Sequence, residues 1–212
     1  MKKNFMMRIA AVLLVLVLLT TCVISGTFAK YVTSDQGEDE ARIAKWGVVV
    51  TLDDFDMFDA NYNNTVISAN GTDKVVAPGT TGTLAGISIT AAPEVKVEVK
   101  FEATLTLTGW EVSGAEYCPL EITVGSTTYK IGTNATDIAD LIDKVEAAIE
   151  GYTAEYDANV NLATSAETPQ VSWTWAFEGN DDVKDTALGD IAANATAPTI
   201  SLQIVTTVTQ ID

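Results

Sequence analysis

The feature that most constrains the fold is a strict alternation of apolar and polar residues from Glu94 to Thr108. Period two over 15 residues predicts a long, half-buried antiparallel strand, because successive side chains of a strand point to opposite faces. We expect the strand to bend or bulge, since it would be about 50 Å long if straight. The apolar positions are Val95, Val97, Val99, Phe101, Ala103, Leu105 and Leu107.

Shorter runs of the same kind recur along the chain, with turn residues such as Asn70-Gly71 and Pro78-Gly79 between them. About ten short strands at this spacing predict an all-β sandwich or barrel. We expect these strands at 46–52, 66–69, 74–77, 83–90, 120–124, 127–131, 160–163, 171–177 and 200–204.

One segment, about 136–150, has a helical period instead. Its apolar residues recur every three or four positions between Thr136, a plausible N-cap, and Gly151, a plausible C-terminal stop. The sequence therefore predicts one amphipathic helix inserted among the strands. Its outer face is acidic, which is typical of a solvated surface, and carries Asp137, Asp140, Asp143, Glu146 and Glu150.

Residues 1–29 have the pattern of an export signal. A basic start precedes the apolar run Ile9–Ile24, and Thr27-Phe28-Ala29 offers small residues at the positions that a signal peptidase recognises. We expect cleavage between Ala29 and Lys30, one secreted domain over 30–212, and no stable membrane span after cleavage. Two alternatives are an uncleaved anchor, although the run of 16 residues is shorter than the roughly 20 that cross a bilayer, and a lipoprotein modified at Cys22.

Charge and composition restrict the function. Without residues 1–29 the chain keeps nine basic against 29 acidic residues, a formal charge of −20, which repels nucleic acid and anionic lipid. The chain has no histidine, which excludes histidine-based triads and zincin motifs. Only Cys118 remains after processing, so no intrachain disulfide forms, and beside Pro119 it is expected to be a buried apolar residue. We therefore expect that this protein is not an enzyme.

Two acidic clusters suggest oxygen ligands for calcium, the one cofactor considered. A simpler interpretation is that these acidic residues lie in solvated loops. A further alternative is that acidic residues form the paired carboxylates of a glycoside hydrolase. The first cluster is Asp53, Asp54, Asp56 and Asp59, and the second is Asp181, Asp182 and Asp185.

Two stretches carry a family resemblance. The junction from Gly26 to Val32, followed by Ala44-Lys45-Trp46-Gly47-Val48, resembles the TasA/camelysin-like secreted proteins of Gram-positive bacteria, whose signal peptides are cut by a SipW-type peptidase. The later stretches Trp173 to Glu178 and Asp185 to Gly189 are similar to a branch of the same proteins.

The resemblance implies a jelly-roll β-sandwich, export to the cell surface or biofilm matrix, and polymerisation into fibres by donation of an N-terminal strand. Carried over to this chain, the donor would be Lys30 to about Ala44, including Tyr31 and Val32. Some relatives have been described as metalloproteases, but this chain lacks histidine and a His-Glu-x-x-His helix, so that activity is not expected here.

The leading hypothesis is therefore a secreted, non-enzymatic structural protein of the cell surface or biofilm matrix. Its expected partners are other copies or another matrix protein, with a signal peptidase during export, and assembly would complete an exposed sheet edge. The alternatives are a monomeric adhesin or lectin-like binding module, with or without bound calcium, and a hydrolase that uses carboxylates alone.

Overall fold

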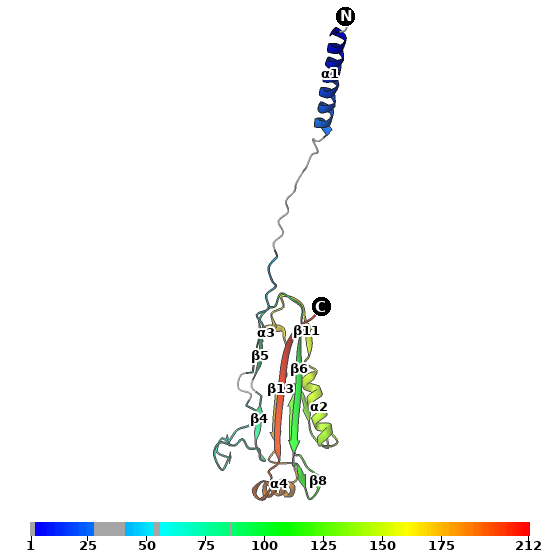
Figure 1. The fold of residues 1–212 in the computed structure, drawn as a ribbon. Helices are drawn as coiled ribbons and strands as arrows, with labels where there is room; N and C mark the ends of the chain where they lie inside the picture. Colours follow the sequence, from blue (N-terminus) through cyan, green and yellow to red (C-terminus); the bar gives the residue numbers. More distant parts are fainter. Residues whose placement is uncertain (1–2, 28–40, 53–55, 85) are drawn as a thin grey trace. The chain divides into compact units, whose positions relative to one another are not determined.

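The computed structural model describes residues 3–27, 41–52, 56–84 and 86–212, which belong to two compact units, Met1–Arg42 and Ile43–Asp212 (Figure 1). In the first unit, helix α1 (Lys3–Thr27) coincides with the apolar run of the predicted signal. Within the described ranges, no helix combines the length and apolar character that crossing a membrane requires.

Two antiparallel sheets form the centre of the second unit. In Figure 1 the two longest strands, β6 and β13, lie side by side in one of them. That sheet has the order β11 (Ala154–Tyr156), β6 (Val97–Thr108), β13 (Thr199–Gln210). The other has the order β10 (Thr127–Tyr129), β9 (Leu120–Val124), β12 (Val171–Trp175), β4 (Thr81–Thr83).

Smaller pairs surround these sheets, and one hydrophobic core joins them all. The pairs are β1 (Val49–Leu52) with β5 (Ile87–Thr90), β2 (Asn61–Tyr62) with β3 (Val66–Ile67), and β7 (Glu111–Val112) with β8 (Ala115–Glu116). The alternation predicted for 94–108 is confirmed in β6, where every second residue from Val97 to Leu105 is buried. The core combines these side chains with inward-facing residues of β9 and β12.

The predicted helix at 136–150 is present as α2 (Ile138–Glu150). It buries Leu141, Val145 and Ile149. The N-cap is Asp137 and not the expected Thr136, because the Asp137 side chain accepts the backbone N–H of Asp140 at 2.8 Å.

The prediction of an all-β jelly-roll sandwich with a single inserted helix is wrong. The described chain is a mixed α/β structure with four helices, 24% helix and 35% strand, and its sheets are several and small. Two helices were not expected: α3 (Leu162–Ser165), where a strand at 160–163 was predicted, and α4 (Asp182–Asn194). Both begin at polar residues whose side chains cap the first turn, Asn161 and Asp181.

Helix α4 was not predicted from the sequence because it lacks a regular apolar stripe. Only Asp185 and Leu188 of its residues are buried, so the three-to-four residue period that revealed α2 does not occur. Two predicted strands also differ. Of the segment 83–90, Thr83 ends β4 and residues 87–90 form β5, whereas 74–77 contributes only a bridge between Val75 and Asp59.

Candidate functional site

The candidate site is the outer edge of β13. This strand pairs with β6 along its whole length, from Thr199 opposite Thr108 to Gln210 opposite Val97. On its other side, no strand in the described part of the chain pairs with it. An edge of this kind offers a row of backbone donors and acceptors to another strand.

The hydrogen-bond phase shows which residues face outward. The N–H of Ile211 donates to the carbonyl oxygen of Lys96 at 3.0 Å, in register with the β6–β13 ladder. Because residues of an antiparallel strand alternate between bonding the neighbour and pointing away, odd-numbered residues of β13 bond β6. The even-numbered residues therefore direct their backbone groups to the open edge: Ile200, Leu202, Ile204, Thr206, Val208 and Gln210.

The composition of β13 is unusual for an edge. Natural edge strands are kept from pairing by charge, proline, bulges or short length. The 12 residues of β13, TISLQIVTTVTQ, contain no charged residue, no proline and no glycine. Backbone geometry and side chains therefore both permit another strand to add here.

The side chains of the same even-numbered residues lie toward the core but are incompletely covered. Ile204 is 6% exposed, whereas Leu202 and Val208 are half-buried. The Oγ1 atom of Thr206 is buried and has no hydrogen-bond partner in the described part of the chain. An added strand would cover the apolar side chains and bring backbone groups near this hydroxyl.

The outer edge of β6, by contrast, is closed by the chain itself. Strand β11 pairs with residues 97–99. Beyond it, the N–H of Phe101 donates to Thr153 Oγ1 at 3.2 Å and the N–H of Leu105 donates to Glu146 Oε1 at 2.8 Å. The edges of the four-stranded sheet, β10 and β4, are only three residues long each. Among the described strands, β13 thus offers the longest open edge.

Most of the predicted processing and donor residues lie outside the described ranges. These are the cleavage pair Ala29 and Lys30 and the donor residues Tyr31 and Val32. They remain predictions. The described end of the donor segment, residues 41–44, has no regular secondary structure and is exposed.

The predicted calcium ligands are only partly described, since Asp53 and Asp54 fall outside the ranges. Asp56 accepts a 2.5 Å hydrogen bond from Lys74 Nζ, and Asp59 Oδ1 accepts the N–H of Ala60 at 2.6 Å. Each carboxylate thus has a partner within the chain. Where the structure is described, no three Asp, Glu, Cys or His side chains form a group able to hold a metal ion.

The second acidic cluster starts helix α4. Asp181 is its N-cap and accepts the N–H of Lys184 at 3.1 Å. Asp185 is 8% exposed and accepts hydrogen bonds from the Tyr117 hydroxyl at 2.7 Å and from Trp175 Nε1 at 3.4 Å. The cluster therefore serves helix capping and a buried polar network.

Three further side chains, Cys118, Trp173 and Trp175, belong to the hydrophobic core. Cys118 is buried, and burial raises the pKa of its thiol to about 12, so it is a core residue as expected. Trp173 and Trp175 are also core residues, and Trp173 Nε1 donates to the Met57 carbonyl oxygen at 2.8 Å.

The sequence prediction did not identify the full length of β13. It placed a strand at 200–204, whereas the ladder continues to Gln210. The polar Thr206 interrupts the apolar alternation, but Val208 continues its phase and is the signal that extends the strand.

No family model, curated protein or solved structure was found that matches this chain.

Proposed function

We propose that this chain is an exported structural protein of the cell surface or biofilm matrix that assembles when a strand of another copy pairs with β13. The observation that carries the proposal is the uncharged 12-residue edge of β13, whose backbone groups point outward at every second residue. Such pairing uses backbone bonds, so it needs no catalytic residue.

The partner strand is Lys30 to about Ala44, including Tyr31 and Val32, from a second copy. Cleavage between Ala29 and Lys30 would free this segment, and its 15 residues are long enough for the 12 residues of β13. The resemblance to TasA/camelysin-like proteins supports the same assignment, since strand donation is implied there.

Electrostatic repulsion explains why assembly would occur at the uncharged edge of β13. Copies with a formal charge of −20 repel one another over most of their surface. The edge of β13 carries no charge, so close approach there avoids placing like charges in direct contact. Salt screens the remaining repulsion, and we expect assembly to increase with ionic strength.

The test compares the protein that begins at Lys30 with one that begins at Lys45. Light scattering and negative-stain microscopy are used to measure particle size, with and without calcium. We expect fibres or oligomers from the longer protein alone. A persistent monomer in every condition would overturn the proposal and favour the monomeric binding module instead.

A pair of substitutions tests whether the edge of β13 is the acceptor. Val208→Lys places a charge on the inward side of the strand, where its half-buried position adjoins the open edge. Thr209→Lys adds the same charge at the next residue, which is exposed on the opposite face. Assembly lost with Val208→Lys and kept with Thr209→Lys supports β13, provided that circular dichroism shows both variants folded. Equal assembly of both would exclude this edge.

A further inference from the structure

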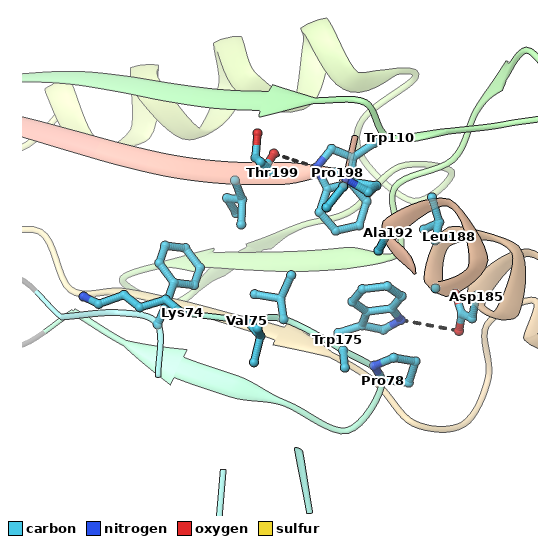
Figure 2. A pocket seen from close by; sticks show the side chains of 16 residues that line it. Lys74, Val75, Pro78, Trp110, Trp175, Asp185, Leu188, Ala192, Pro198 and Thr199 are labelled. Carbon is cyan, nitrogen blue, oxygen red and sulfur yellow. Dashed lines mark hydrogen bonds between the residues drawn. The ribbon is translucent and has the colours of Figure 1, made fainter. Parts of the chain in front are cut away.

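A cavity of about 410 Å³ lies beside helix α4 and includes Asp185 of the second acidic cluster in its lining (Figure 2). Its lining comes from the segment 74–78, the end of β12, helix α4, the residues 197–200 at the start of β13, and the single residues Phe58 and Trp110. Cavities of roughly 300–1,000 Å³ hold small molecules in other proteins. Its size therefore suits a ligand with a single ring or a short branched chain.

Two buried indole rings form much of the apolar wall. Trp110 is 1% exposed and Trp175 is 4% exposed, and their ring centroids lie 5.6 Å apart at an angle of 57°. Trp110 Nε1 donates to the carbonyl oxygen of Thr199 at 2.8 Å, which fixes its ring (Figure 2). Faces of such rings attract cations as well as apolar groups.

A buried carboxylate gives the cavity its polarity. Asp185 lines the cavity and receives hydrogen bonds only from neutral donors, the Tyr117 hydroxyl and Trp175 Nε1. None of the ion pairs found among the described residues involves it, and its neighbour Lys184 pairs with Asp181 instead.

The one lysine of the lining does not neutralise this charge. Lys74 lies across the cavity from Asp185 in Figure 2, and its ammonium group pairs with Asp56. A buried carboxylate without a cation beside it gains stability when a cation binds, since burial otherwise penalises the charge. Aromatic walls and this carboxylate together select for an organic cation.

We propose that the cavity binds a small organic ammonium ion, with its charged group toward Asp185 and its hydrocarbon part against Trp110 and Trp175. The proposal does not depend on strand addition, although Thr199 and Ile200 at the start of β13 line the cavity. The cavity gives the protein a ligand-binding function that assembly does not require.

The experiment titrates the protein, purified from cells that express the full chain, with three probes of one size. Benzylammonium is positive, benzyl alcohol is neutral and benzoate is negative. Tryptophan fluorescence reports binding, because two of the four tryptophans line the cavity. At physiological salt we expect benzylammonium to bind at least tenfold more tightly than benzyl alcohol, and benzoate not to bind. Equal binding of all three, or no saturable binding, would overturn the proposal.

Three variants locate the binding. Gly189→Leu adds an apolar side chain at a lining position where a Cβ meets no described atom within 4 Å. Asp185→Asn removes the charge while keeping the shape. Asp182→Asn removes the same charge from an exposed position in the same helical turn.

We expect benzylammonium binding to be lost in Gly189→Leu, reduced at least tenfold in Asp185→Asn and unchanged in Asp182→Asn. If the two asparagine variants weaken benzylammonium binding equally, the binding reflects general attraction of a cation to an acidic protein. The proposal of a cation site in the cavity would then be wrong. Fluorescence-monitored melting shows that each variant is folded.

Discussion

The backbone N–H of Leu105 donates to Glu146 Oε1 at 2.8 Å, which joins the middle of β6 to helix α2. Leu105 is buried, so its N–H has no access to water and needs this partner. The helix thereby closes the edge of β6 beyond β11. The long edge that stays open in this sheet is that of β13, which makes α2 a determinant of where another strand can add.

Replacing Glu146 should show how much its hydrogen bond with Leu105 contributes to the free energy of unfolding. In Glu146→Ala the Leu105 N–H loses its acceptor, and we expect the free energy of unfolding to fall by about 2 kcal/mol, as for other buried unsatisfied donors. Chemical denaturation measures the change. Glu146→Gln keeps an acceptor oxygen and should recover most of the loss.

The control is Asp143→Ala, an exposed acidic residue on the same helix. It removes the same charge with no effect on the β6 edge, so we expect a change below about 0.5 kcal/mol. Equal destabilisation by the two alanine variants would show that charge and helix propensity, not the bond to Leu105, explain the effect.

Local periodicity made much of the fold predictable. The strands β6, β9 and β12 and the helix α2 follow from alternation or a helical period that continues through the segment. Helix α4 depends instead on capping by Asp181 and on burial of Leu188 against distant parts of the chain, which a local pattern does not display. Neither the free edge of β13 nor the Glu146 bond was predictable, because both depend on which strands become neighbours.

Gly82 should tolerate no side chain. A Cβ built at this position would overlap the Met57 carbonyl oxygen and crowd Trp173 Nε1, the two atoms of a buried hydrogen bond. Because the closest atom is backbone, β4 or the Met57 segment would have to shift. We expect Gly82→Ala to lower the free energy of unfolding by about 3 kcal/mol, from overpacking and weakening of this bond.

Gly86→Ala is the matched control, since a Cβ there meets no atom within 4 Å and its φ is not positive. Thermal melts of both variants are compared with the parent protein. A Gly82→Ala protein as stable as Gly86→Ala would contradict the close packing of Met57 and Trp173 around β4.

The start of α2 should lose stability in acid through Asp140. Its carboxylate accepts hydrogen bonds from Lys144 Nζ at 2.8 Å and from the N–H of Thr136 at 2.8 Å, and these lower its pKa, Lys144 having the largest effect. A carboxyl with a lowered folded-state pKa stabilises the fold above its unfolded pKa of about 3.9, and this contribution disappears as the pH falls through the folded-state value.

We therefore expect Asp140→Asn to melt below the parent protein at pH 7, with a difference that narrows below about pH 4 and vanishes in stronger acid. Melting temperatures of the parent, Asp140→Asn and the exposed control Asp143→Asn are measured across this range. If the two variants differ from the parent by the same amount at every pH, Asp140 does not have the role described.

Thr206 lies in β13 and carries a buried hydroxyl, which we interpret as a mark of an edge that another strand would complete. Among the described residues its Oγ1 has no hydrogen-bond partner, a state that ordinarily costs about 1–3 kcal/mol. Thr206→Val keeps the shape and removes the polar atom, so we expect the free energy of unfolding of the monomer to rise by about 1 kcal/mol. Thr207→Val, at the exposed next position, should change it by less than about 0.5 kcal/mol. If Thr206→Val destabilises the monomer, the hydroxyl has a partner in solution and no longer marks an uncompleted edge.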